Sequence, residues 1–448
     1  MKKLMAVLLA AAMIASASTA ALAAVQNVRL GGDIRTRAYY TKNLYSVDSQ
    51  ADHDDFYFRQ RTRVSAEADL TDNVWAVATV EADGLWGRQR VVAETSQNEE
   101  GETITTYKKV DNDWDVNVAE AYIQLSEIFY SPWTTKIGRQ YLNYGRGFLI
   151  SSREWEYKFD TWRNILDFYP WTIDLFYSRL VESDAIGGFG SDKPADDEDL
   201  FGLNLNYQED YWTMEGYVFG VRDAFHEDYG DDQSAPVAVG FRFDASPVEA
   251  FDIWGEFAYQ FGKYQQTGMA SDESIRAFGF DAGAVYVFDV TWEPAIALSY
   301  TYGSGDKGED AENPNKKMFD PMFNYNYYGY AYSPRLSNIG ILNAQLSVLP
   351  SDAWTLILDF YYYSQDKERA MVMGNPDMDN GGVSAPTNGD EKDLGMELDV
   401  ILEYDYTEDV AAQLVAAWFK PGDAYNTPEN DSSPDDVVEL RAELRINF

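Results

Sequence analysis

The chain has 448 residues, no cysteine, two histidines and a net charge of −40 from 75 acidic and 35 basic side chains. This composition excludes disulfides and thiolate metal sites, leaves little for histidine-based catalysis and argues strongly against a nucleic-acid partner. A disordered acidic chain would lack the aromatic content of 15%, and a mean hydropathy of −0.40 argues against a helical membrane protein.

The first 23 residues, MKKLMAVLLAAAMIASASTAALA, have the pattern of a secretory signal peptide. Lys2 and Lys3 precede an apolar run, and Ala21-Leu22-Ala23 fits the small-x-small rule for cleavage. The alternative is an uncleaved anchor helix, but the Ala-rich run that ends in this site favours the signal peptide. We therefore expect one mature domain over residues 24–448.

Apolar and polar side chains then alternate in segments of roughly ten residues, the length that a tilted membrane strand needs. The last segment, DVVELRAELRINF, places Leu440 and Leu444 on one face and Glu439 and Arg441 on the other. The alternation predicts eighteen strands, over residues 27–40, 56–70, 73–83, 115–126, 133–142, 159–168, 171–180, 199–208, 211–221, 236–244, 250–263, 275–288, 292–303, 336–349, 352–365, 391–405, 408–420 and 436–448.

The connections between these strands alternate in length. Tight turns lie at 71–73, 168–170, 208–210, 350–352 and 406–409, with two somewhat longer turns at 126–132 and 244–249. Long loops rich in Asp, Gly, Asn and Pro lie at 84–114, 181–198, 222–235, 304–335, 366–390 and 421–435. This sorting is typical of an all-β, antiparallel, up-and-down transmembrane β-barrel with short periplasmic turns and long outer loops.

We expect strand 436–448 to pair with strand 27–40 and close the barrel, because lipid does not tolerate open sheet edges. Apolar faces then point to lipid and polar faces line a lumen. Aromatic rings near the strand ends are expected to form girdles at the membrane interfaces, among them Tyr39, Tyr40, Trp133, Trp171, Trp212, Trp354 and Tyr404. The predicted location is the outer membrane of a Gram-negative bacterium.

Arginines gather on the predicted lumen face of three adjacent strands, namely Arg35, Arg37, Arg59, Arg61, Arg63, Arg441 and Arg445. We interpret them as a cationic wall that attracts anions in a confined channel. The alternative is that they pair with nearby acids in cross-strand ladders that hold the barrel together. Arg163 also points inward, and inward acids collect elsewhere, at Asp359, Glu397, Asp399 and Glu403.

An enzyme would need a catalytic constellation, and the sequence has no triad, zinc or phosphate-loop signature. The pair Asp52-His53 lies in a loop with no partner pattern. We expect no cofactor. Divalent cations could bind the acidic loops ADHDD (51–55) and NPDMDNGG (375–382) through carboxylates, and ion bridges from these loops to lipid headgroups are an equal alternative.

The stretch KIGRQYLNYGRGFLISSREWEYKFDTWRN (136–164) resembles the alginate-export family of outer-membrane barrels. The matching residues are Gly138, Arg139, Gln140, Gly145, Trp155, Phe159, Asp160 and Arg163. A second patch, Gly303-Ser304-Gly305-Asp306 followed by Phe319-Asp320-Pro321, is similar to a loop of the same family. Phe448 suits barrels that the outer-membrane assembly machinery inserts.

The resemblance implies an eighteen-stranded monomeric barrel whose arginine-lined pore passes an acidic polysaccharide, and it adds Arg139 to the candidate substrate-binding arginines. In one respect the sequence departs from the family: the known exporter closes its pore with a long periplasmic loop, whereas the periplasmic turns here are all short. The leading expectation is export of an alginate-like polysaccharide. The alternatives are a general or anion-selective porin and a structural or surface-binding barrel without flux.

Overall fold

The computed structural model describes residues 27–44, 47, 54–87, 90–97, 103–110, 114–152, 157–182, 197–223, 234–264, 273–307, 315–324, 328–368, 391–426 and 434–448. The predicted signal peptide over 1–23 lies outside the described residues. The predicted cation loop 375–382 and residues 51–53 of the other cation loop also lie outside them.

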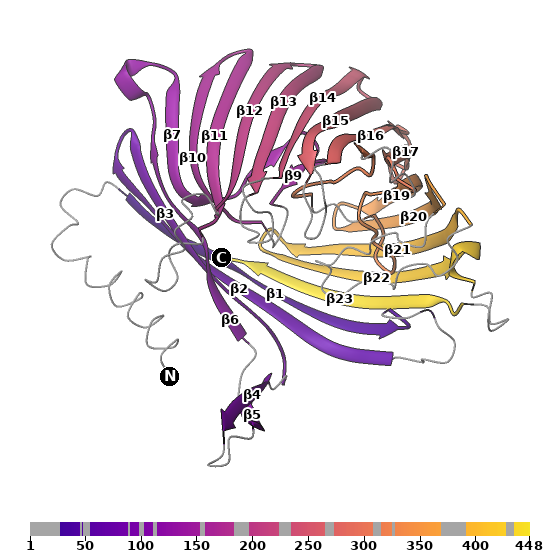
Figure 1. Ribbon diagram of the computed structural model, residues 1–448. Helices are drawn as coiled ribbons and strands as arrows, with labels where there is room; N and C mark the ends of the chain where they lie inside the picture. Colours follow the sequence, from indigo (N-terminus) through magenta and orange to yellow (C-terminus); the bar gives the residue numbers. More distant parts are fainter. Residues whose placement is uncertain are drawn as a thin grey trace.

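Eighteen antiparallel strands form a closed barrel (Figure 1). In barrel order they are β1 (Asn27–Lys42), β2 (Asp54–Thr71), β3 (Val74–Leu85), β6 (Trp114–Leu125), β7 (Trp133–Gln140), β10 (Phe159–Phe168), β11 (Trp171–Val181), β12 (Glu198–Glu209), β13 (Trp212–Asp223), β14 (Ala235–Val248), β15 (Phe251–Tyr264), β16 (Glu273–Val287), β17 (Ala295–Gly303), β19 (Ile339–Ser351), β20 (Trp354–Gln365), β21 (Asp393–Thr407), β22 (Val410–Pro421) and β23 (Val437–Asn447). β23 pairs with β1, which confirms the predicted closure.

The two faces of the wall follow the predicted alternation. On β23, Leu440 and Leu444 lie on the outer surface with about half of their area exposed, at 45% and 48%, while Glu439, the residue before Leu440, is buried. Successive side chains of a strand point to opposite faces, so the apolar row faces lipid and the polar row faces the lumen. No helix among the described residues is long and apolar enough to cross a membrane.

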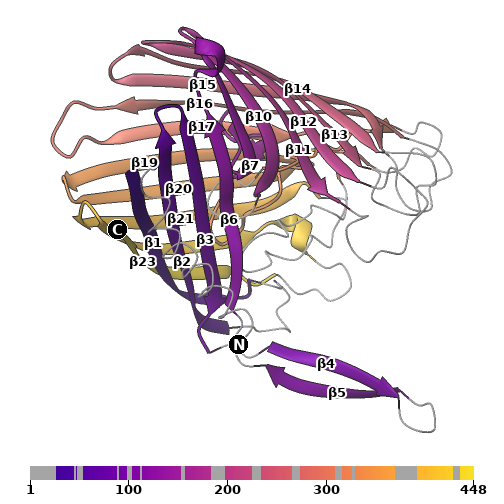
Figure 2. The ribbon, with the colours of Figure 1, turned by 90° about the vertical axis from the view of Figure 1, so that its left-hand side faces the viewer.

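Short turns and both described chain ends lie at one end of the barrel, which the general pattern of such barrels places at the periplasm. Two details differ from the predictions. β17 begins at Ala295, and a turn over 288–294 replaces the start of the predicted strand 292–303. Within the predicted loop 84–114, β4 (Arg90–Gln97) and β5 (Thr103–Val110) form a hairpin that projects away from the barrel wall (Figure 2).

Two of the long connections fold into the barrel. The first follows β7 and contains β8 (Asn143–Tyr144) and β9 (Ile150–Ser151), and the second follows β17 and contains β18 (Asn315–Lys316). They meet where the Phe148 and Phe319 rings lie 5.4 Å apart and where Asn324 Nδ2 donates to the Phe148 carbonyl at 2.9 Å. We call them the inward loops, 141–152 with 157–158 and 315–324 with 328–338. Because they carry buried apolar side chains, much of the hydrophobic core lies inside the lumen.

Aromatic rings near the turn end stack across neighbouring strands, as the girdle prediction requires. Tyr207 contacts Trp171 at 4.6 Å and Trp212 at 4.9 Å between ring centroids, and Trp354 stacks on Tyr404 at 4.3 Å. The prediction that Tyr39 belongs to a girdle is wrong. It is only 1% exposed and stacks on Tyr57, because its position along β1 has the same parity as the inward arginines.

Candidate functional site

Strand register brings the predicted arginines together on β2, β1 and β23. Arg35 lies level with Arg61 on one side and with Arg445 on the other. We call these three residues the arginine row. One step farther along, Arg37 lies level with Arg59. Arg35 and Arg61 are almost fully buried, at 1% and 4% exposed. Three neighbouring strands therefore place guanidinium groups at one height of the lumen wall.

Carboxylates accompany these arginines. Arg61 Nη2 lies 3.0 Å from Asp33 Oδ2, and Arg37 Nε lies 2.5 Å from Glu443 Oε2, which also pairs through its other oxygen with Arg445 at 3.3 Å. Two further pairs link β2 to β3: Arg59 with Asp83 at 3.0 Å and Arg63 with Glu81 at 2.7 Å. These contacts are the cross-strand ladders of the alternative interpretation, in which the arginines hold the barrel together. We call it the paired-strut alternative. Sequence reasoning missed Glu81 and Asp83 because it weighed acids only on the arginine-bearing strands.

Arg441 and Arg163 lie where the wall meets the inward loops. The Arg441 guanidinium lies 4.4 Å from the centroid of the Tyr330 ring and donates to Gln413 Oε1 at 3.1 Å. Arg163 Nε donates to Asp174 Oδ2 at 2.7 Å, and its guanidinium lies 5.6 Å from the Tyr144 ring. Both arginines therefore position loop aromatics as well as contributing charge.

Arg139 differs from the other predicted arginines because it lies on the outward face of its strand. It shares the parity of Ile137, which is exposed on the outer surface, and it forms a bidentate pair with Asp160 at 2.7 and 2.8 Å. Asp160 has the parity of the exposed Trp162. The expectation that Arg139 lines the pore is therefore not met: it holds β7 to β10 on the outer face.

Strand carboxylates fix both inward loops by accepting backbone N–H groups. Glu215 and Glu256 accept from Gly145 at 2.8 Å and from Arg146 at 2.7 Å. Glu397 accepts from three consecutive amides, those of residues 330, 331 and 332, at 2.6, 2.8 and 2.8 Å. Hydrogen bonds to a charged acceptor are about twice as strong as neutral ones, so these three side chains hold the loops in the lumen.

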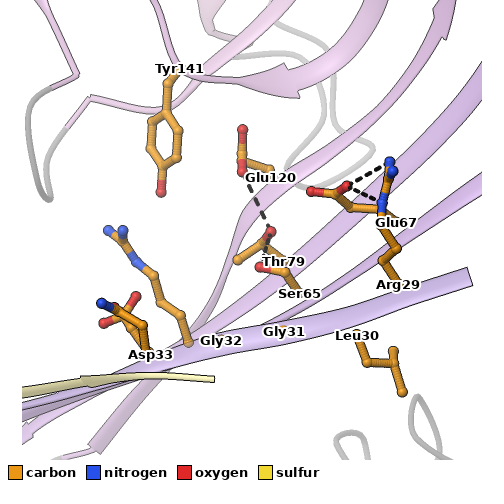
Figure 3. A pocket seen from close by; sticks show the side chains of 12 residues that line it. Arg29, Leu30, Gly31, Gly32, Asp33, Ser65, Glu67, Thr79, Glu120 and Tyr141 are labelled. Carbon is orange, nitrogen blue, oxygen red and sulfur yellow. Dashed lines mark hydrogen bonds and ion pairs between the residues drawn. The ribbon is translucent and has the colours of Figure 1, made fainter. Parts of the chain in front are cut away.

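A cavity of about 440 Å³ lies between the wall near the chain ends and the first inward loop (Figure 3). Tyr141 points into it from the loop, while Leu30 points to the other side of β1. Thr79 donates to Glu120 at 3.4 Å, and Arg29 pairs with Glu67 at 3.1 Å. Burial raises the pKa of the Tyr141 phenol, which stays neutral, and its oxygen has no hydrogen-bond partner among the described residues. The cavity thus offers both donors and acceptors.

Within the described residues, no group of three His, Cys, Asp or Glu side chains is placed to hold a metal ion. The two predicted cation loops fall wholly or mostly outside those residues, so cation binding there stays a prediction. The two family-like patches include parts of both inward loops and the strand ends beside them, and the two loops meet at Phe148 and Phe319.

An apolar outer face, a charged lumen and eighteen strands closed on themselves define an outer-membrane channel barrel of the porin type. The chain belongs to the alginate export family, whose model matches residues 26–439. The alginate production protein AlgE of Pseudomonas aeruginosa is 27% identical to it over 187 residues. That match covers 37% of this chain and 36% of AlgE, so the matched part spans about a third of the relative's length.

Solved structures of porins share the fold. OccAB3 of Acinetobacter baumannii has a TM-score of 0.56 at 9% identity, with 94% of this chain and 99% of that chain covered. OccK8 (OprE) of Pseudomonas aeruginosa has a TM-score of 0.56 at 9% identity, with coverage of 95% and 99%. The predicted fold, the family and the assignment as a non-enzymatic outer-membrane barrel are confirmed.

Proposed function

We propose that this barrel exports an acidic, alginate-like polysaccharide through its lumen. The observation that carries the proposal is the arginine row, Arg61, Arg35 and Arg445, which places three guanidinium groups level on adjacent strands. Membership of the alginate export family supports the substrate class.

The carboxylates that pair with the arginines lower the affinity of the wall for an anionic substrate, and transport requires such weak binding. An isolated arginine wall would hold a polyanion too strongly to release it, and conduction needs sites that are favourable enough to enter and weak enough to leave. Glu443 already divides its two oxygens between Arg37 and Arg445. A carboxylate of the substrate can replace one such contact at little cost, and the protein carboxylate can take it back as the chain moves on.

The test removes the charge of the row and keeps its size. In Arg35→Gln/Arg61→Gln/Arg445→Gln, we expect a folded channel whose reversal potential in a salt gradient shifts away from anion preference. The shift should be largest at low salt, because the Debye length shortens to roughly 10 Å at 0.1 M. Block of the current by an acidic oligosaccharide should also weaken. Arg139→Gln is the matched control, since it removes an ion-paired arginine from the outer face.

The paired-strut alternative makes the opposite prediction for the same variant. If the row serves only to hold three strands together, the triple change lowers the melting temperature and leaves the reversal potential and the block unchanged. That pair of results would overturn the proposal.

A second candidate, a porin for small anionic solutes, is favoured by the inward loops. They line two cavities of the lumen, of about 440 and 200 Å³, each far smaller than a polymer segment of several sugars. Liposomes that hold the barrel separate the candidates: a porin admits monosaccharide acids and excludes longer chains, whereas an exporter passes the chain. A barrel without conductance in a planar bilayer would instead be structural or surface-binding.

A further inference from the structure

The second cavity, of about 200 Å³, lies on the far wall from the arginine row. Strands β15 to β20 supply Trp254, Asp281, Ser299, Thr301, Ile341, Asn343 and Tyr361, and the inward loops supply Arg146, Phe148 and Tyr328. The cavity is therefore assembled only when both loops are folded into the lumen. None of these residues was a candidate from the sequence.

Charge does not select the ligand of this cavity. Its single cation, Arg146, pairs with Asp244 at 3.0 Å and faces Asp281 at 3.6 Å. The guanidinium also lies 4.5 Å from the centroid of the Trp254 ring. Arg146 is thus engaged on several sides by the protein. A carboxylate of the ligand would therefore bind less strongly in this cavity than at the arginine row.

Polar groups without protein partners line the same cavity. The hydroxyl of Ser299 and the phenol of Tyr361 have no hydrogen-bond partner among the described residues. Thr301 and Asn343 are oriented by carboxylates, through a bond to Asp281 at 2.7 Å and a bond to Asp359 at 3.0 Å. The lining is more polar than apolar, with the Trp254 and Phe148 rings among these polar groups, and this composition suits a ligand that carries several hydroxyls.

We infer that this cavity binds one sugar ring of the transported chain by its hydroxyls and its apolar C–H face, and not by its carboxylate. The inference rests on the proposed polysaccharide export and adds to it a neutral recognition site. The volume, below the 300–1,000 Å³ of typical drug-sized sites, fits a single ring. The chain would then be guided on one wall by charge and on the other by its hydroxyls.

The experiment measures block of single-channel current by two oligosaccharides of equal length, one acidic and one with its carboxyl groups reduced to alcohols. Ser299→Ala/Tyr361→Phe should weaken block by both sugars alike, by roughly 2- to 10-fold for each hydrogen bond lost. The reversal potential should stay at the wild-type value because no charge is removed. Because neither hydroxyl has a hydrogen-bond partner among the described residues, the fold should be unaffected. Ser347→Ala, an inward position of β19 outside the cavity, is the matched control and should change nothing.

The outcomes separate this inference from the proposed function. If each sugar blocks the double variant as strongly as it blocks the wild type, the ring site is overturned and the export channel stands. Weakened block by the acidic sugar alone also overturns it, since recognition would then depend on charge. If neither sugar blocks the wild type, the ring site and polysaccharide export fall together.

Discussion

The parity of a residue along its strand decides what that residue does in this protein. Arg61 and Arg139 have the same chemistry and each pairs with an aspartate. Arg61 shares the inward face of Arg35, whereas Arg139 shares the outward face of Ile137. Because side chains alternate with a period of two, a shift by one position exchanges lumen and lipid.

Parity leads to a matched pair of lysine substitutions. Leu398 is 42% exposed on the outer face of β21, and Lys at this position should destabilise the barrel by about 2–4 kcal/mol near the midplane. Thr355 on β20 has inward parity and lies level with Glu403, so Thr355→Lys should be tolerated. Urea unfolding in detergent or lipid measures both. Equal losses at the two sites would contradict the assignment of faces.

At this scale the sequence predicted the faces well, because alternation is a local signal. Arg35, Arg37, Arg59, Arg61, Arg63, Arg163, Arg441 and Arg445 have inward parity as expected. It could not predict partners such as Glu81 and Asp83, which depend on the register between strands. Arg139 became a candidate through the family motif and not through its parity. The motif lies at the end of β7, where the first inward loop begins.

The inward loops show how a connection can become part of the lumen. Glu397 accepts three consecutive backbone amides and is fully buried, and Tyr363 donates to the carbonyls of Tyr328 and Tyr332. None of these five hydrogen bonds uses a side chain of residues 330–332. Strand side chains therefore hold the second loop by its backbone as well as by its aromatic rings.

Removing this support should release the second loop while the wall stays closed. Glu397→Ala leaves three buried amides without an acceptor, at a cost of about 1.5–3 kcal/mol for each bond to a charged group. We expect faster proteolysis within 328–338 and a larger, noisier open-channel current. Glu403→Gln on the same strand, whose carboxylate accepts from Gln413, is the control. Unchanged proteolysis and current in Glu397→Ala would show that the loop is held by other contacts.

The sequence did not predict that these loops enter the lumen. The predicted strands leave residues 143–158 and 304–335 as connections, but the direction of these connections is set by side chains far away in the chain, such as Glu256 for Arg146. A signal was present: each family-like patch includes part of one of these loops. Their apolar residues Phe148, Leu149 and Ile150, fully buried here, would be poorly placed in solvent.

The whole molecule is closed by the β1–β23 pairing, and the absence of native cysteine allows a clean test. Ala38 and Ala442 are register partners, so Ala38→Cys/Ala442→Cys should form a disulfide on oxidation. The oxidised barrel should keep a distinct gel mobility after heating until a reductant is added. Ala38→Cys/Ala416→Cys, with the second cysteine on β22, should not cross-link. Cross-linking in the control alone would mean that the register of the seam is wrong.

Of the eighteen strand pairings in the wall, seventeen join wall strands that are consecutive along the chain, and one joins the first strand to the last. The exception joins residues as distant as Arg37 and Glu443, 406 positions apart. Until β23 arrives, the sheet has two open edges, and neither edge can remain in lipid. Hairpins can form early and in any order, but insertion cannot be completed before this event. Pairing of the 11 residues of β23 with β1 is therefore the step that completes insertion of the barrel into the membrane.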